Sequence, residues 1–453
     1  MILLLQTFLQ MKRKEVWPVM LAGLFFFCVL AALMVVRPAR EALGLQRGIE
    51  TVRWLFLGTL LLTLLVNPLF GVLVSRYRRR VFVSITYLFF AVGLLVFYAL
   101  LVFTPTAVGQ TSGMVFYVWF SVFNLFATML FWAFMVDSFT PDQSERLFGA
   151  VAVGGTLGAL FGPWLAGALV PHVGTAALLP VASGFLMAAV VAAHVLGAWV
   201  KPRADRVFGT DPSSPQPTDP HMQGGRVINE VYPDPLEERL IGGKAWDGFK
   251  TTVQSPYLLG IAGYVLLVAI MATLLYFTRL QMVSALVDDT DGRTVIFARI
   301  DFITQATTLI LQALITGHIM RRLGVAVALV LLPFTVALGF IGLAVTGTLT
   351  ALIVLEAAFR AVQRGIMRPA RETLFTVVPR AQRYKSKAFI DTFVYRGGDA
   401  VGAQTEGLLG RLGMGLAGLA AFALPLAVLW AMLGVWLGWM QRKRKGESHD
   451  DAT

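Results

Sequence analysis

Long apolar runs separated by short polar segments dominate this chain. A helix that crosses a membrane needs about 20 mainly apolar residues. Twelve runs meet this requirement, each bounded to within a few residues: 16–36, 52–74, 81–103, 114–136, 147–170, 176–199, 257–278, 295–317, 324–346, 349–368, 387–410 and 414–440. The pattern therefore predicts an all-α membrane protein with twelve transmembrane helices.

The longest polar stretch divides the twelve runs into six and six. Residues 201–240 hold seven prolines and predict a flexible linker, and the run KAWDGFKTTVQSP after it predicts a short interfacial helix. We therefore expect an N-terminal six-helix half over 1–200, a cytoplasmic linker over 201–255, and a C-terminal six-helix half with a basic tail over 256–453.

Basic residues gather on one side of this predicted topology. Clusters of Lys and Arg precede the first span, join the second to the third and the eighth to the ninth, precede the eleventh and follow the twelfth. Short cytoplasmic loops carry such an excess. We expect both termini and the linker to be cytoplasmic in a multi-pass protein of a bacterial inner membrane.

Composition agrees with the membrane prediction and narrows the partners. The chain is 57% hydrophobic and 14% charged, whereas soluble domains are about 25% charged. The net charge of +12 reflects the basic loops, and no nucleic-acid module occurs, so we expect no nucleic-acid partner. At the N-terminus the apolar stretch precedes the basic cluster, which is not the order of a signal peptide, and Met11 is an alternative start. The single cysteine, Cys28, can form no internal disulfide and so does not indicate a cellular compartment.

The two predicted halves contain similar short motifs. Gly71 precedes Ser75 and a run of arginines at the end of the second span, and Gly317 precedes Arg321 and Arg322 at the end of the eighth. Both motifs resemble degenerate versions of the major facilitator loop, although Ser75 and Arg321 replace its aspartate. Paired six-helix halves predict alternating access around a midplane site.

Glycine-rich runs in the fifth and eleventh spans also match loosely. Gly154, Gly155 and Gly158 lie in one, and Gly398 and Gly402 lie in the other. Small residues let helices approach closely, so we favour a packing role for both runs.

The tenth span carries charged residues at four-residue spacing, namely Glu356, Arg360, Arg364, Arg368 and Glu372. Residues four apart share one helix face. A charge at the bilayer centre costs about 3 kcal/mol or more, so it faces a protein interior or a watery cavity. Three arginines on one face predict a cavity for anions. The alternative is a chain of internal ion pairs, Glu356 with Arg360 and Arg368 with Glu372.

The first span ends in Arg37-Pro38-Ala39-Arg40-Glu41, the residue types that recur at 368–372. Arginine suits phosphate because its planar fork can donate two parallel hydrogen bonds. Arg37 and Arg40 are therefore candidate anion ligands. The alternatives are snorkelling of these side chains to the interface and pairing of Arg40 and Glu41 with Glu50 and Arg53.

Several acids accompany these arginines. Asp137 ends the fourth span, where it is a gate acid, a proton site or an exposed carboxylate at a helix end. Asp391 and Asp399 lie in the eleventh span, and Arg396 is spaced to pair with Asp399. Because acids nearly balance arginines in the second half, we expect much of this charge to be paired.

Motifs of enzymes and metal sites are absent from the sequence. There is no Gly-x4-Gly-Lys phosphate loop, no hydrolytic motif and no histidine pair at metal-ligand spacing. We therefore expect a protein that is not an enzyme and needs neither cofactor nor metal. Energy for transport would come from gradients or exchange.

Four segments carry a resemblance to a known family: 37–41; 131–137 with 146–149; 248–250 with 255–259; and 371–372 with Pro379 and 384–391. They resemble the ATP/ADP translocases of bacteria and plastids, nucleotide exchangers distantly related to major facilitators. The resemblance implies twelve helices and nucleotide exchange. It also implies candidate roles in binding or gating for Arg37, Asp137, Arg371, Glu372, Lys385 and Lys387. Arg371 stands where the family has lysine, and Asp137 where it has glutamate.

We therefore predict a monomeric secondary active transporter of major facilitator architecture that exchanges nucleotides, such as ATP and ADP, or another phosphorylated or anionic solute. The predicted substrate-binding residues are Arg37, Arg40, Arg360, Arg364, Arg371, Lys385 and Lys387. The predicted gating or proton-coupling residues are Asp137, Glu356, Glu372, Asp391 and Asp399. One alternative is a proton-coupled carrier of a drug or metabolite, and another is a membrane scaffold or sensor that transports nothing.

Overall fold

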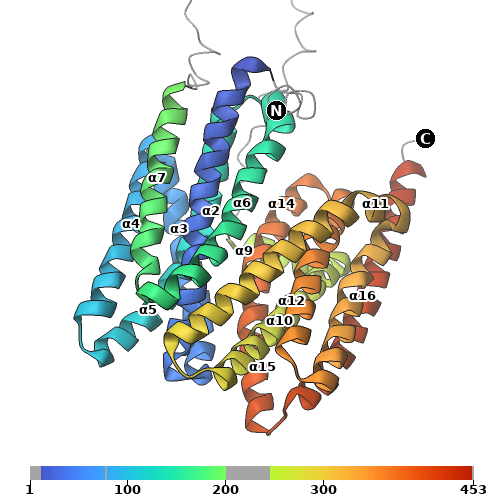
Figure 1. The fold of residues 1–453 in the computed structure, drawn as a ribbon. Coiled ribbons are helices and arrows are strands. Elements are labelled where there is room, and N and C mark those ends of the chain that lie inside the picture. Colours follow the sequence, from blue (N-terminus) through green and yellow to red (C-terminus); the bar gives the residue numbers. More distant parts are fainter. Residues whose placement is uncertain (1–11, 77–78, 200–244, 451–453) are drawn as a thin grey trace, which may run out of the picture.

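The computed structural model describes residues 12–76, 79–199 and 245–450. The helices that precede residue 200 pack together as the N-terminal bundle (Figure 1), which comprises α2 (Val16–Gly44), α3 (Ile49–Arg76), α4 (Arg79–Phe103), α5 (Thr106–Ser138), α6 (Pro141–Val173) and α7 (Leu178–Trp199). Short 3₁₀ turns, η1 (Arg13–Glu15) and η2 (Leu45–Arg47), flank α2.

The helices after residue 244 form the C-terminal bundle, beside the first in Figure 1. It comprises α9 (Ala245–Gln254), α10 (Pro256–Leu286), α11 (Thr290–Thr346), α12 (Leu349–Val362), the π-helical η4 (Gln363–Met367), α13 (Arg368–Leu374), the 3₁₀ turn η5 (Phe375–Val377), α14 (Arg380–Phe389), the π-helical η6 (Ile390–Val394), α15 (Tyr395–Arg411) and α16 (Leu416–Asp450).

Each bundle surrounds one central helix, α2 in the first and α10 in the second. In the most apolar 18-residue stretch of each, 72% of the residues are buried, a larger share than in the other spanning helices. Over these stretches both helices are apolar on every face, as expected of a helix enclosed by others. The core around α2 is rich in rings, with Phe26 stacked on Phe131 at a centroid distance of 4.0 Å.

The predicted fold class, an all-α protein that crosses a membrane many times, is confirmed. Ten helical segments of the described chain are long and apolar enough to span a bilayer. The tenth and eleventh predicted spans are the more polar paths α12–η4–α13 and α14–η6–α15. The eighth and ninth are parts of α11, separated at Gly324, whose φ of 73° is accessible to glycine without strain.

The first span is longer than predicted. The apolar pattern ends at residue 36, but α2 continues through Pro38 to Gly44. The helix continues because the charged residues of its last turns have buried partners in the protein, described below, and do not have to reach water.

The arrangement of the helix ends can be followed in Figure 1. The first turn of α2, the last turn of α7 and the last turn of α16 lie at the same end of the molecule, as an even number of spans in each half requires. The predicted short helix before the seventh span is present as α9, which packs against α14. Met11 and the linker 201–240 lie outside the described residues, so the exact division into halves stays a prediction, as does the cytoplasmic placement of this end.

The glycine runs of α6 and α15 bring helices into backbone contact, which confirms their packing role. A Cβ on Gly154 would lie 2.1 Å from the carbonyl oxygen of Gly23, and one on Gly158 would lie 2.3 Å from that of Phe27. A Cβ on Gly402 would come within 3.1 Å of the α10 backbone at Ile270. Backbone atoms inside a helix cannot move aside cheaply, so a side chain at these positions forces the helices apart.

We expect Gly154→Ala to lower the free energy of unfolding by about 1–3 kcal/mol, the usual cost of overpacking a core. Gly149→Ala is the matched control on the same helix, because nothing lies within 4 Å of a Cβ there. That control should leave stability unchanged or raise it by up to about 1 kcal/mol. The measurement is the melting temperature of the purified protein in detergent, and equal melting of the two variants would contradict the packing role.

Glu15 ties the start of α2 to the start of α6. It accepts hydrogen bonds from the backbone amide of Lys12 at 3.0 Å, from Gln143 Nε2 at 3.1 Å and from Arg146 Nη2 at 3.2 Å. Burial by itself raises the pKa of Glu15, but these hydrogen bonds and the charge of Arg146 outweigh it and hold the pKa below its usual value.

We expect Glu15→Gln to destabilise the protein by about 1 kcal/mol at pH 7. A carboxylate whose pKa is lowered by folding contributes stability that is complete above its unfolded pKa and is lost as the pH falls through its folded pKa. The difference in melting temperature from wild type should therefore shrink below about pH 4. Asp288→Asn, at a fully exposed carboxylate, is the control and should change little at any pH. A gap that stays constant down to pH 3 would contradict this prediction.

Candidate functional site

The two bundles meet where α2, α3 and α6 of the first contact α10, α11 and α15 of the second. A cluster of buried apolar residues from both bundles seals this junction: Ala42, Leu45, Val52, Tyr117, Phe277, Leu280, Val283, Phe297, Ile300 and Ala403. This junction lies at the C-terminal end of α2, far from Val16. The basic loops lie at the other end of the molecule.

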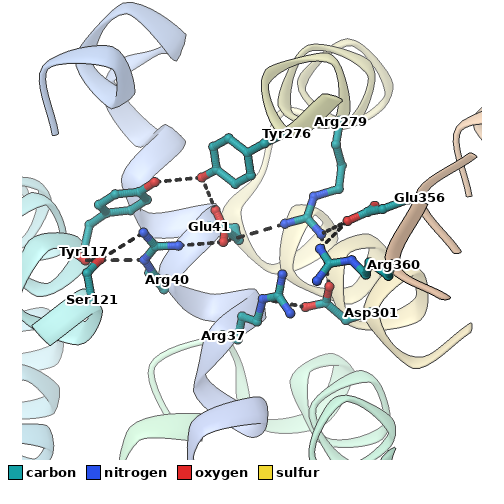
Figure 2. A network of polar contacts seen from close by, with 10 residues as sticks. All are labelled: Arg37, Arg40, Glu41, Tyr117, Ser121, Tyr276, Arg279, Asp301, Glu356 and Arg360. Carbon is teal, nitrogen blue, oxygen red and sulfur yellow. Dashed lines mark hydrogen bonds and ion pairs between the residues drawn. The ribbon is translucent and has the colours of Figure 1, made fainter. Parts of the chain in front are cut away.

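A network of ion pairs crosses the junction, and Arg279 of α10 is its centre (Figure 2). The Arg279 side chain is completely buried. It lies 3.6 Å from Glu41 of the N-terminal bundle, 3.0 Å from Asp301 and 3.2 Å from Glu356. Arg37 of the N-terminal bundle lies 3.5 Å from the other oxygen of Asp301. One guanidinium therefore joins carboxylates from α2, α11 and α12, and Asp301 in turn receives an arginine from each bundle.

A second part of the network joins Arg40 to two tyrosines. Arg40 donates to Glu41 at 2.8 Å and to Ser121 Oγ at 3.1 Å, and its guanidinium lies 3.7 Å from the centre of the Tyr117 ring. The hydroxyl of Tyr276 donates to Glu41 and lies 2.8 Å from that of Tyr117. Arg40 is therefore held inside the protein (Figure 2), and the alternative that it snorkels to the interface is wrong.

Two further polar links close the junction at its sides. Arg53 of α3 pairs with Glu406 of α15 at 2.9 Å, and Glu50 pairs with Arg411 at 2.7 Å. The expected pairing of Glu50 and Arg53 with Arg40 and Glu41 is therefore wrong, because α3 packs along α15 and not against the end of α2. Beyond α6, the amide of Thr175 donates to Asp291 of α11 at 2.7 Å.

The arginines of the tenth span have unequal partners. Arg360 is bound by Glu356, as the ion-pair alternative predicts. Arg364 is half-buried and donates to the neutral Gln305 at 3.0 Å. Arg368 is exposed and has no hydrogen-bond or ion-pair partner within the described residues, and the expected pair of Arg368 with Glu372 does not form. Arg360 is therefore neutralised by a carboxylate, whereas Arg364 and Arg368 are not.

The π-helix η4 keeps this ladder together. Residues four apart on an α-helix drift around its axis by about 40° per step, so the ladder would leave one face over its length. The wider turn of a π-helix counters this drift. Arg364 in η4 is consequently within electrostatic range of the like charges on Arg360, Arg368 and Arg37.

Positive charge exceeds negative charge around the network. Its four guanidiniums face three carboxylates, those of Glu41, Asp301 and Glu356. Arg364 adds a further positive charge whose partner is an uncharged amide. A site with unneutralised guanidiniums in a low-dielectric interior favours an anionic ligand.

A cavity of about 350 Å³ lies inside the C-terminal bundle, between α10 and the two π-helical segments. It is lined by Val265, Val268, Gln363, Met367, Arg368, Arg371, Glu372, Asp391 and Tyr395. Arg371 lies 3.0 Å from Asp391 and 3.1 Å from Glu372, which also binds Lys387. The structure therefore brings together four of the predicted residues, Arg371, Glu372, Lys387 and Asp391.

The remaining predicted residues are Asp137, Lys385 and Asp399. Asp137 is half-buried in the last turn of α5. Lys385 is half-buried in α14, where its backbone carbonyl approaches Gly248 of α9. Asp399 of α15 accepts from Thr273 at 3.2 Å and pairs with Arg396 at 3.3 Å, as the spacing predicted.

Sequence reasoning missed the two tyrosines and the central role of Arg279. Tyr117 and Tyr276 are single hydroxyls in apolar helices, and such hydroxyls find a partner when buried. Arg279 follows an apolar run of α10, so the sequence marks it as an unusual charge. Its three partners lie 22, 77 and 238 residues away in the chain, and the sequence does not indicate them. Among the described residues no group of acids, histidines or cysteines is arranged to hold a metal ion.

Comparisons with known proteins agree with this architecture. The family model of the Major Facilitator Superfamily matches residues 19–403. The fold is similar to a bacterial homologue of the iron transporter ferroportin in an inward-facing state (14% identity, 94% of this chain and 100% of that one, TM-score 0.61). It is also similar to a POT family transporter in complex with 5-aminolevulinic acid (12%, 93% and 96%, TM-score 0.60) and to the nucleoside transporter NupG (13%, 94% and 99%, TM-score 0.54). No curated protein sequence matches.

Proposed function

Because the chain belongs to the Major Facilitator Superfamily, we propose that it is a secondary active transporter that exchanges a phosphorylated or otherwise anionic solute, nucleotides among them, by alternating access. The observation that carries the anionic class is the excess of guanidinium over carboxylate between the bundles, with Arg364 bound to a neutral amide. The bundles supply arginines from both sides, Arg37 from the first and Arg360 and Arg364 from the second, as a site shared between halves requires.

The network suggests how substrate binding and opening are coupled. In this state Asp301 and Glu356 occupy the guanidiniums of Arg37 and Arg360. A bound phosphate offers the same bidentate acceptor geometry as these carboxylates. A substrate anion would therefore compete with Asp301 for Arg37 and loosen the link between the bundles. An empty transporter would keep the link, which favours exchange over one-way release.

Transport assays test this proposal directly. Proteoliposomes loaded with unlabelled solute would be offered labelled ATP, ADP, inorganic phosphate, or small organic phosphates and carboxylates, and adenosine serves as the matched control without phosphate. We expect saturable uptake of at least one anion that depends on solute inside, and none of adenosine. Absence of saturable uptake in every exchange pairing would refute the proposal.

A thermal-shift panel selects the solutes to label. A ligand of the native state present at 100 times its Kd stabilises the protein by about 2.7 kcal/mol. Stabilisation by anions but not by neutral analogues supports the proposed class. If no solute stabilises the protein and none is transported, the scaffold or sensor alternative gains support.

One observation favours a second candidate, a proton-coupled carrier. Asp399 lies in α15, within the predicted eleventh span, where it is 15% exposed and pairs with the partly exposed Arg396. Such intramembrane carboxylates serve as proton sites in transporters. In that case a pH gradient alone should drive uptake, and Asp399→Asn should abolish this drive while sparing solute exchange. Uptake that ignores the pH gradient would exclude it.

A further inference from the structure

The cavity inside the C-terminal bundle is separate from the network at the junction. Val265 lines the cavity and Arg279 centres the network, and both lie on α10. Fourteen residues of α-helix separate them, which corresponds to about 20 Å along the axis. The cavity lies toward the start of α10, away from the sealed junction.

The cavity has the build of a ligand site. Its floor is apolar and buried, formed by Val265, Val268 and Met367, and its rim carries charge. Its volume is at the smaller end of the roughly 300–1,000 Å³ typical of ligand pockets, so it suits a phosphate or a small charged group better than a whole nucleotide. Both π-helical segments border it, through Gln363 and Met367 on one side and Asp391 on the other. Such segments are frequent at functional sites.

Two arginines of the rim have hydrogen-bond donors without a partner among the described residues. Glu372 is bound by Arg371 and Lys387, and Asp391 is bound by Arg371. The Nε of Arg371 is nevertheless buried without a hydrogen-bond partner. Arg368 has no polar partner among the described residues, although its side chain lines the cavity. The buried Nε of Arg371 is costly to leave without a partner, and an anion in the cavity would accept hydrogen bonds from it and from the exposed Arg368.

We propose that this cavity is a second anion site, in which Arg368 and Arg371 capture the phosphate or carboxylate group of the solute before it reaches the junction. Arg364 lies one four-residue step further along the same ladder, about 6 Å on. The anion can therefore pass from Arg368 to Arg364 and on to Arg37 and Arg360. Its place in transport rests on the proposed function, whereas binding of an anion does not.

Thiol labelling in the full-length protein tests the binding. In a Cys28→Ala background, which removes the single native thiol, Tyr395→Cys places a reactive group on the cavity wall. The probe is inorganic phosphate, with chloride at equal ionic strength as the control, and the reporter is the rate of reaction with N-ethylmaleimide. We expect phosphate to slow labelling and chloride to leave it unchanged. Labelling that phosphate does not slow would overturn the inference.

Matched substitutions separate the cavity from diffuse charge. Arg368→Gln should raise the phosphate concentration needed for protection by about tenfold or more, since a hydrogen bond to a charged group is lost. Arg442→Gln removes the same charge from an exposed residue next to Gln441, which itself binds Thr373 just beyond the cavity, and should change nothing. An equal effect of both variants would overturn the inference.

Sidedness of transport shows whether the site captures solute. In vesicles of known orientation, Arg368→Gln should raise KM for the transported anion about tenfold from the face where the basic loops lie, with little change in kcat or in KM from the other face. Equal KM changes at both faces would overturn the capture role. If phosphate protects the thiol but no anion is transported, the proposed function is refuted and the anion site stands. If an anion is transported but phosphate gives no protection, the anion site is refuted and the proposed function stands.

Discussion

Replacing Arg279 with methionine lowers the free energy of unfolding by about 3–5 kcal/mol, because it strands buried carboxylates that have lost their shared cation. Arg279 is completely buried and lies within 3.6 Å of Glu41, Asp301 and Glu356. For a chain of 453 residues the loss corresponds to a fall in melting temperature of about 3–5 °C. Differential scanning fluorimetry of the purified protein measures it.

Two comparisons separate this effect from simple loss of charge. Arg411→Gln removes an inter-bundle arginine whose side chain is 72% exposed, and an exposed pair is worth about 0–1 kcal/mol. Adding Glu356→Gln to Arg279→Met removes one of the stranded acids and should recover part of the stability, a non-additivity expected of residues in contact. If the Arg279→Met variant has the same melting temperature as the wild type, the network does not hold the bundles together.

Replacing Arg364 with glutamine lowers kcat/KM for anion exchange by about 10- to 100-fold, since a hydrogen bond to a charged group contributes about 1.5–3 kcal/mol. The protein should stay stable, because the partner of Arg364 is the neutral Gln305 and no carboxylate is stranded. Initial rates in proteoliposomes give kcat and KM, and the melting temperature gives stability.

Arg364→Lys and Arg411→Gln complete the test. Lysine keeps the charge but lacks the bidentate fork, so it should recover only part of the exchange. Arg411→Gln should leave the rates unchanged, since that residue lies at the exposed side of the junction. Full exchange by Arg364→Gln would show that the excess positive charge at the junction does not bind the solute.

The sequence by itself determined the helices and the residues that had to be explained. Apolar runs of spanning length can satisfy their backbone inside a bilayer only as helices, so their number and approximate bounds follow from local pattern. Charges such as Arg360 and Arg364 stand out for the same reason, since a bilayer tolerates them only with a partner or a cavity. The glycines of α6 likewise predicted close packing of helices.

Only the tertiary structure decided which charged side chains pair with one another. Arg53 binds Glu406, 353 positions away, and Tyr276 binds Glu41 across the junction. Spacing along one helix could propose Glu356 with Arg360, but it also proposed Arg368 with Glu372, and there Arg371 and Lys387 are nearer. The pairing of distant charges depends on how helices pack, and packing is set by the fit of whole surfaces, which a periodic pattern along one chain does not encode.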